Sequence, residues 1–251
     1  MKQFRFGILG AGGIAHKFCN AVGKVDDACV AAVASKDQKR AWRFAKRLGI
    51  EDFYRDYEHL LAREDIDAIY IATTHNFHYE NIIACLKHNK PVLCEKSMVP
   101  TAAQAQEIFS LAKEKKLFVM EAMWSRFLPH INQARQWIKE GRIGNLEAAT
   151  CAIGFSASRD PAHRINNPEL GGGAAYDIGV YAIELTTYLI DEPVIDVQSM
   201  LTRSETGVDK TDSILLRFPS CTANLQATTA ATVREELCIY GSEGFIRIPR
   251  A

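Results

Sequence analysis

The segment 171–181 of this chain, GGGAAYDIGVY, combines glycines with an acid and a phenol, Asp177 and Tyr181, that can hold or move a proton. Asp177 and Tyr181 are four residues apart, so on a helix they would lie on one face and could act on one ligand. Gly179 is expected to leave space for that ligand, and the glycine triplet is expected to allow a close backbone approach. The alternative is a flexible loop followed by a helix that carries an acid and a phenol by chance.

Polar side chains also follow two apolar runs that are predicted strands. Thr73, His75 and His78 lie in TTHNFH, and Glu95 and Lys96 lie in CEKS. Ligands of an open α/β sheet bind beyond the carboxyl ends of its strands, so these residues are candidates for cofactor contact. Such a lysine could donate a hydrogen bond to a ribose hydroxyl and bias a substrate hydroxyl electrostatically. The alternatives are helix capping by the histidines and a surface ion pair of Glu95 with Lys96, worth well under ~1 kcal/mol.

The first apolar run, residues 4–9, leads into the motif Gly-x-Gly-x-x-Ala and then into a helical pattern. Gly10 permits a tight turn, Gly12 lets a pyrophosphate approach the backbone, and Ala15 lets the helix pack on the strand. The N–H groups and positive dipole end of that helix would face the phosphates. The cofactor-binding residues predicted in this turn are Gly10, Gly12, Gly13, Ile14 and Ala15.

The residues after the second predicted strand bear on which dinucleotide binds. An acidic residue about 20 positions past the glycines would hold the ribose hydroxyls and select NAD. This chain has Ser35 and Lys36 at the end of that strand, and a hydroxyl with a cation suits a 2′-phosphate. NADP is therefore the predicted cofactor. Asp37 keeps NAD open, and Lys36 could instead be a solvated turn residue.

Apolar runs alternate with helical patterns over the first 120 residues. Continuous apolar strands separated by helices predict a parallel sheet covered on both faces, which is the doubly wound Rossmann fold. The predicted strands are 4–9, 29–34, 66–73, 91–94 and 117–120, and the predicted helices are 37–48, 76–88 and 101–114.

The pattern changes after residue 122, where short strands with turn signals follow one another and predict an antiparallel sheet. The predicted elements are helices 127–141 and 174–190, a loop over 157–173, and strands 148–156, 194–203, 212–218, 222–230 and 235–241. The sequence therefore predicts an NAD(P)-binding Rossmann domain over 1–122. An α+β substrate or dimerisation domain with an open, mostly antiparallel sheet is predicted over 123–251.

Composition narrows the class of partner. Lys plus Arg and Asp plus Glu both number 30, so no net field attracts nucleic acid or a membrane surface. No apolar run reaches the ~18 residues that a membrane span needs. Seven scattered cysteines without a CxxC motif predict reduced thiols in a cytoplasmic protein. Seven dispersed histidines predict no metal site, so the expected partner is a small molecule.

Together these segments resemble the glucose–fructose oxidoreductase/inositol dehydrogenase (Gfo/Idh/MocA) family along the whole chain. The resemblance rests on the glycine motif of residues 10–15, on Glu95-Lys96 and on the segment 171–181. Two further stretches, THNFH at 74–78 and EAMWSRFLP at 121–129, resemble the dihydrodiol dehydrogenase branch and its bacterial sugar-dehydrogenase-like relatives.

The resemblance implies an NADP-dependent enzyme that moves hydride between an alcohol carbon of a sugar or cyclic diol and nicotinamide. The family's pocket residues match Lys96, Asp177 and Tyr181. Tyr181 would be the general acid/base, and a nearby Lys96 ammonium would favour its phenolate and lower its pKa. Asp177 would orient the substrate or Lys96.

The pocket wall is also expected to include aromatic and basic side chains. Trp124 and Arg126 follow from the similarity, and Phe155 is a further candidate. Trp124 could equally belong to ordinary core at the junction of the domains.

Two features depart from the family pattern. Ser97 stands where the family has Pro, and a cis bond before a non-proline residue costs about 2.5–4 kcal/mol. The Lys96–Ser97 bond is therefore expected either to be trans or to be held cis by other contacts. The second domain is also shorter than usual, which predicts a truncated product or a natural short form.

The expected oligomer is a homodimer through the C-terminal sheet, as in the family. Two other functions stay open: a catalytically impaired NAD(P)- and sugar-binding regulatory protein, and a relative that holds its cofactor permanently.

Overall fold

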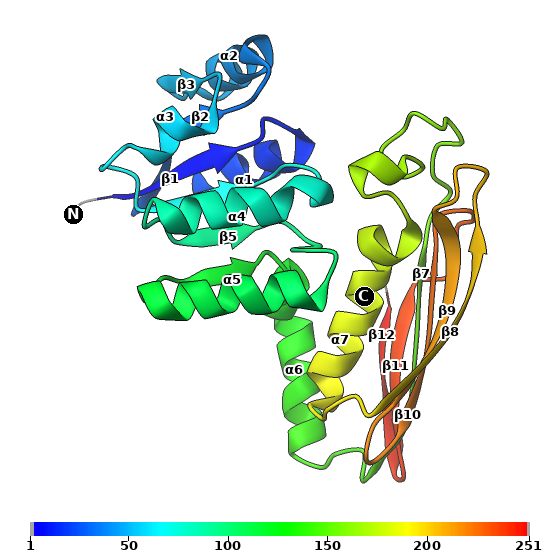
Figure 1. Cartoon of the computed structure of the whole chain (residues 1–251). Coiled ribbons are helices and arrows are strands. Elements are labelled where there is room, and N and C mark those ends of the chain that lie inside the picture. Colours follow the sequence, from blue (N-terminus) through cyan, green and yellow to red (C-terminus); the bar gives the residue numbers. More distant parts are fainter. Residues whose placement is uncertain (1–2, 250–251) are drawn as a thin grey trace. The chain divides into compact units, whose positions relative to one another are not determined.

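The computed structural model in Figure 1 describes residues 3–249. The chain divides into two compact units, residues 1–122 and 123–251. All seven cysteines are free thiols, and five of them are buried.

The N-terminal unit is a doubly wound α/β fold. Its six strands form one parallel sheet in the order β3-β2-β1-β4-β5-β6. The elements in chain order are β1 (Phe4–Leu9), α1 (Gly13–Val22), β2 (Ala28–Ala34), α2 (Gln38–Leu48), β3 (Asp52–Tyr54), α3 (Tyr57–Leu61), β4 (Ala68–Ile71), a 3₁₀ turn (His75–Phe77), α4 (His78–Lys87), β5 (Val92–Cys94), α5 (Ala102–Lys115) and β6 (Val119–Glu121).

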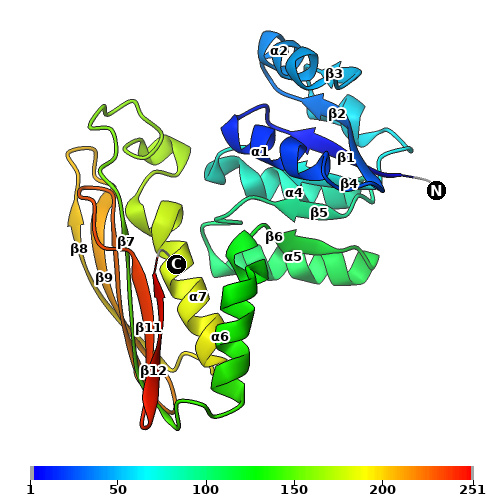
Figure 2. The ribbon, with the colours of Figure 1, turned by 180° about the vertical axis from the view of Figure 1, so that it is seen from behind.

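Helices cover both faces of this sheet, as Figures 1 and 2 show from opposite sides. One core cluster joins the sheet to α3, α4 and α5, and a second joins it to α1 and α2. Strand β4 is buried throughout, with Ile69 and Ile71 in the first cluster and Tyr70 in the second. The Rossmann fold predicted from the continuous apolar runs is therefore confirmed.

Strand β3 and helix α3 were not predicted from the sequence. They contain three and five residues, which is too short for a clear periodic pattern. The start of α3 is capped by Asp56, whose carboxylate accepts a hydrogen bond from the His59 N–H at 3.0 Å.

The C-terminal unit is a six-stranded sheet covered on one face by α6 and α7. The strand order is β12-β11-β7-β10-β9-β8, and only the β7–β10 pair among the described strands is parallel. The elements are a 3₁₀ turn (Trp124–Phe127), α6 (Pro129–Lys139), β7 (Leu146–Gly154), a 3₁₀ turn (Pro168–Leu170), a π-helical turn (Ala175–Gly179), α7 (Val180–Ile190), β8 (Asp196–Arg203), β9 (Asp209–Arg217), β10 (Thr222–Thr228), β11 (Glu236–Gly241) and β12 (Gly244–Pro249).

Buried and exposed residues alternate along β9 and β10, which explains why helices cover only one face of this sheet. Ile214, Leu216 and Leu225 are buried against residues of α6 and α7, while their neighbours in the strands are exposed. The predicted mostly antiparallel sheet is thus confirmed. One detail differs: the helix predicted over 174–190 begins as a π-helical turn.

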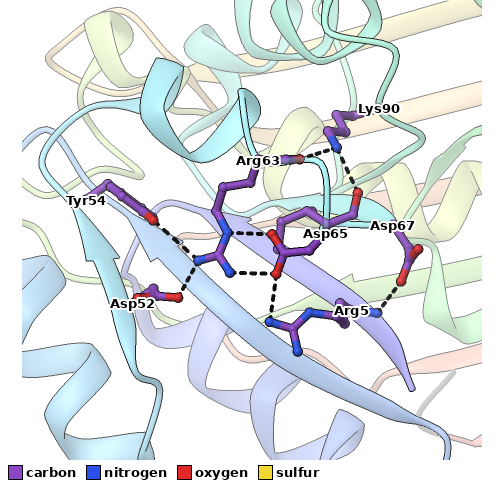
Figure 3. A network of polar contacts seen from close by, with 8 residues as sticks. Arg5, Asp52, Tyr54, Arg63, Asp65, Asp67 and Lys90 are labelled. Carbon is purple, nitrogen blue, oxygen red and sulfur yellow. Dashed lines mark hydrogen bonds and ion pairs between the residues drawn. The ribbon is translucent and has the colours of Figure 1, made fainter. Parts of the chain in front are cut away.

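A polar network lies at the amino ends of the N-terminal strands (Figure 3). Arg63 donates hydrogen bonds to both oxygens of Asp65, at 2.9 and 2.7 Å, and to the Asp52 carboxylate at 2.5 Å. It also donates to the Tyr54 hydroxyl at 3.3 Å, and Arg5 reaches Asp65 from β1 at 2.9 Å. The network therefore ties β1 and β3 to the loop after α3.

Lys90 belongs to the same network and is only 8% exposed. Its ammonium donates to the carbonyl oxygens of Arg63 at 2.5 Å and Ile66 at 2.9 Å (Figure 3). A buried charge is costly unless hydrogen bonds compensate it. Here the cation fixes the loop that leads into β4.

We predict that Lys90→Met destabilises the chain by about 1–3 kcal/mol, because two buried carbonyl groups lose their donor. Urea unfolding followed by circular dichroism measures the effect. Lys87→Met, on the exposed side of α4, is the matched control and should change stability by less than about 0.5 kcal/mol. Equal stability of the two variants would contradict the assigned role of Lys90.

Candidate functional site

At the glycine turn after β1, the backbone of the fold itself requires the first glycine, Gly10. Gly10 has φ +101°, and a Cβ there would lie 2.7 Å from the carbonyl oxygen of Ala72 on the neighbouring strand segment. The Gly10 N–H donates to the Ala34 carbonyl at 2.9 Å. Glycine is therefore required here by backbone conformation and by the close approach of β1 to β4.

The next two glycines border open space. A Cβ on Gly13 would meet nothing within 4 Å among the described residues, and one on Gly12 would meet only the Ala72 oxygen at 3.9 Å. Gly12 is the N-cap of α1, and the first turn of the helix contains no acidic residue. The turn thus presents backbone N–H groups that no side chain of the cap covers, which fits a phosphate group. Ile14 is exposed, whereas Ala15 is fully buried against the sheet.

The residues after β2 favour a phosphorylated ribose. Asp37 caps α2, because its carboxylate accepts from the Arg40 N–H at 3.1 Å. Ser35 is buried, and its hydroxyl accepts from the Asp37 N–H at 3.4 Å. The Lys36 ammonium lies 4.9 Å from the centre of the Phe77 ring. The acidic group that kept NAD open is thus engaged in a helix cap, while a cation lies beside it in the chain.

Lys96 follows β5, and the residue before it is fixed to β4. The Glu95 N–H donates to the Ile71 carbonyl at 2.9 Å, and the Tyr70 hydroxyl donates to the Glu95 carboxylate. Burial raises the pKa of Glu95. Burial and the adjacent Glu95 carboxylate raise the pKa of Tyr70, so the phenol stays protonated as the donor.

The residues after Lys96 are fixed from two further elements. The carbonyl of Ser97 lies 2.9 Å from His78 Nδ1 at the start of α4. The Met98 N–H donates to Glu121 Oε1 on β6 at 2.7 Å. The Lys96–Ser97 peptide bond is cis, which is the second of the two expected alternatives.

His78 was predicted to contact the cofactor, and its geometry indicates a different role. The ring is 0% exposed, and its second nitrogen lies 3.0 Å from the Thr73 carbonyl. Burial lowers the pKa of His78. Each ring nitrogen faces a carbonyl oxygen, and a neutral imidazole donates to one of the two at a time. His78 therefore lies between the segments that follow β4 and β5 and can hold either of them. Its neighbour His75 is partly exposed and meets it edge to face, with ring centres 5.7 Å apart.

Asp177 and Tyr181 both lie in the C-terminal unit, in the π-helical turn and in α7. Asp177 is 5% exposed, and its carboxylate accepts from Arg164 Nη1 at 3.0 Å. The Tyr181 hydroxyl accepts from Trp124 Nε1 at 3.0 Å, and the two rings meet edge to face with centres 6.2 Å apart. Trp124 is 58% exposed, so it is not ordinary core of this unit.

The other two residues predicted to line the substrate pocket, Arg126 and Phe155, lie in different parts of the C-terminal unit. Arg126 forms an ion pair with Glu184, one turn after Tyr181, and lies 4.8 Å from the centre of the Tyr188 ring. Phe155 comes directly after β7 and is 36% exposed. Glu184 and Arg164 were missed in the sequence because each acts through a partner far away in the chain.

The fold itself requires glycine at Gly172 and Gly173, a role that the sequence did not indicate. A Cβ on Gly172 would lie 2.5 Å from the Ile165 carbonyl oxygen, and one on Gly173 would lie 2.2 Å from the Asp209 carboxylate. Gly179 is buried, and its Cβ position lies 3.4 Å from Ala227 on β10. The close approach is therefore made by the chain's own loop and sheet.

Two neighbouring acidic residues of β9, Asp209 and Asp212, lie below this turn, and Asp209 contacts it. Asp209 accepts a hydrogen bond from the Ala175 N–H at 2.7 Å, at the start of the π-helical turn. Asp212 is 5% exposed, and its Oδ2 has no hydrogen-bond partner among the described residues. Burial, and then the hydrogen bond with Asp209, raise the pKa of Asp212 to about 7.

Two family models match the chain. One, described as "Oxidoreductase family, NAD-binding Rossmann fold", matches residues 4–123, and the "GFO/IDH/MocA C-terminal domain" matches residues 131–247. The trans-1,2-dihydrobenzene-1,2-diol dehydrogenase of Xenopus tropicalis is 34% identical over 98% of this chain and 75% of its own length. The chain belongs to the GFO/IDH/MocA oxidoreductase family.

Two further proteins of similar sequence or structure were found. The D-xylose 1-dehydrogenase (NADP(+)) of Hypocrea jecorina is 35% identical over 86% of this GFO/IDH/MocA chain and 62% of its own length. The crystal structure of KijD10, a 3-ketoreductase from Actinomadura kijaniata, with NADP and TDP-benzene matches with a TM-score of 0.89. Its identity is 28%, over 99% of this chain and 77% of that one.

These matches confirm the family, its dihydrodiol dehydrogenase-like branch and the expectation of a dehydrogenase. Within residues 3–249, no three His, Cys, Asp or Glu side chains gather in a way that could hold a metal ion. No helix in that part of the GFO/IDH/MocA chain has the length and apolar character needed to cross a membrane.

We predict that Asp212→Asn flattens the pH dependence of stability. The folded pKa of about 7 lies above the usual carboxyl value, so stability from this group falls as pH rises through 7. An amide stays neutral and can still donate to Asp209. At pH 8 the variant should gain about 1–3 kcal/mol over the parent, with little change at pH 4.

Thermal unfolding between pH 4 and 8 measures this effect. Asp196→Asn, at the exposed start of β8, is the control and should leave the pH profile unchanged. A parallel profile for Asp212→Asn and the parent would show that Asp212 is ionised in the fold at neutral pH.

Proposed function

We propose that this chain is an NADP-dependent dehydrogenase that oxidises an alcohol carbon of a sugar or cyclic diol and reduces the corresponding carbonyl. The observation that carries the proposal is the hydrogen bond from Trp124 to the Tyr181 oxygen. An N–H that donates to a phenol oxygen stabilises the phenolate more than the phenol, which suits a general acid/base.

The residues that bind the cofactor are proposed from the N-terminal unit. The open first turn of α1 receives the pyrophosphate, and the Ser35 and Lys36 segment receives the 2′-phosphate. The NADP named for the Hypocrea jecorina enzyme, and bound in the KijD10 structure, supports the choice of NADP for this chain. The full proposed set is Gly10, Gly12, Gly13, Ile14, Ala15, Ser35, Lys36, Thr73, His75, Glu95 and Lys96, with His78 as a positioning residue.

The proposed reaction uses few groups of the chain. When bound, the nicotinamide ring supplies the hydride acceptor or donor. Tyr181 takes the proton from the substrate hydroxyl during oxidation and returns it during reduction. Lys96 assists by favouring the phenolate with its positive charge. Asp177 orients the substrate or Lys96, while Arg164 compensates the charge of this buried carboxylate.

The substrate wall is proposed to include Trp124, Arg126 and Phe155, which are all partly or largely exposed. The sugar and diol named for the two curated relatives support a polyhydroxylated substrate class. The cytoplasmic location and the homodimer through the C-terminal sheet stay predictions.

We predict that Tyr181→Phe lowers kcat by about 10²–10⁴-fold while cofactor affinity changes little, because only the proton-transfer group is lost. Absorbance of reduced nicotinamide, with a panel of aldoses, inositols and cyclic diols, measures turnover. Tyr188→Phe lies on the same helix and keeps its ring beside Arg126, so it should retain activity. If the parent binds NADP but turns over no substrate of the panel, the regulatory-protein alternative is favoured instead.

We predict that Lys36→Ala raises the Kd for NADP about tenfold or more, which corresponds to about 1.4 kcal/mol, and changes the Kd for NAD less than twofold. Titration of each dinucleotide against tryptophan fluorescence measures both constants. Lys24→Ala, in the exposed turn after α1, is the control for general charge loss. Equal losses for NAD and NADP would assign Lys36 a role other than 2′-phosphate recognition.

A further inference from the structure

The C-terminal unit contains a cavity of about 370 Å³ that none of the predicted site residues lines. This volume lies within the range of small-molecule sites. Three segments form it: the loop after β7, the β8–β9 turn with the start of β9, and the residues after β10. The lining residues are Ser156, Ala157, Ser158, Arg159, Pro161, Asn166, Ser204, Glu205, Thr206, Lys210, Thr229 and Ala230.

Hydrogen bonds join these three segments to one another. The Ala157 N–H donates to the Thr229 carbonyl at 2.9 Å, and the Thr229 N–H donates to the Lys210 carbonyl at 2.8 Å. Asn166 donates its amide to the Ser158 carbonyl at 2.7 Å, which fixes the loop against itself. The cavity is therefore bounded by backbone that is tied together, so its shape does not depend on long side chains alone.

The lining residues are rich in hydroxyl groups. Five of the twelve lining residues are serine or threonine, and the apolar ones are two alanines and a proline. Ser204 and Thr206 hydroxyls already hydrogen-bond one another at 2.8 Å. Such a surface offers many donors and acceptors to a polyhydroxylated ligand.

The charged residues of the cavity favour a ligand with negative charge. Arg159 and Lys210 line it, and neither has an ion-pair partner among residues 3–249. Glu205 is the single carboxylate in the lining, so cations exceed acids by two to one. An anion that enters this space would meet a guanidinium and an ammonium that the described part of the fold leaves uncompensated.

We propose that this cavity binds a small polyhydroxylated anion, a sugar that carries a phosphate or a carboxylate. The hydroxyl groups of the wall bind the sugar, and Arg159 with Lys210 binds the anionic substituent. The loop that supplies Arg159 also supplies Arg164, the partner of Asp177. Binding here is independent of turnover, so the inference stands or falls apart from the proposed dehydrogenase activity.

Isothermal titration of the full chain, without cofactor, tests the proposal with glucose 6-phosphate, glucuronate and glucose. At least one anionic sugar should bind tenfold or more tightly than glucose. Comparison of glucose 6-phosphate with glucuronate then shows whether the site prefers a phosphate or a carboxylate. Arg159→Gln and Lys210→Met should each weaken binding of the anion about 5–10-fold, as expected for loss of one charged contact.

Arg217→Gln, at the far end of β9 and equally exposed, is the matched control and should bind like the parent. Added salt should weaken binding of the anionic sugar and leave that of glucose unchanged. Thermal unfolding checks that each variant is folded. Equal affinity for the anions and glucose, no binding of either anion, or the same loss in Arg217→Gln would overturn the proposal.

Discussion

The position of Lys96 depends on contacts that neighbouring strands and a helix make with the residues on either side of it. Tyr70 on β4 holds the preceding residue, His78 at the start of α4 holds the following carbonyl, and Glu121 on β6 holds the next backbone N–H. Each contact comes from a different strand or helix of the N-terminal unit. These contacts fix the backbone of Lys96 at the carboxyl edge of the sheet, where ligands of such sheets bind. The place from which its side chain extends is therefore set by the fold.

The two edges of the parallel sheet carry different polar groups. At the amino edge, Arg63 and Lys90 are saturated by carboxylates and carbonyl groups, so the charges there stabilise the fold. At the carboxyl edge, the first turn of α1 has neither a side-chain cap nor an acid. Polar groups that are already satisfied cannot bind a ligand without losing partners. This contrast directs the cofactor proposal to one edge only.

The sequence alone was enough for five of the six strands of the parallel sheet, because these are continuous apolar runs whose burial does not depend on distant contacts. It was also enough for Gly10, whose type follows from the turn between β1 and α1. The role of Gly173 could not be predicted in this way. Its constraint is the approach of Asp209, which follows it by more than thirty residues. Spacing within one segment carries no information about such contacts.

The same limit explains why charged partners were missed at the candidate site. Asp177 and Tyr181 were identified from their four-residue spacing, but their hydrogen-bond partners, Arg164 and Trp124, come from separate loops. A buried acid is either protonated or compensated by a cation, and Arg164 supplies a cation to the buried Asp177. Arg164 lies in the loop after β7 that also lines the proposed anion cavity. One loop thus supplies both a wall of that cavity and the cation that compensates Asp177.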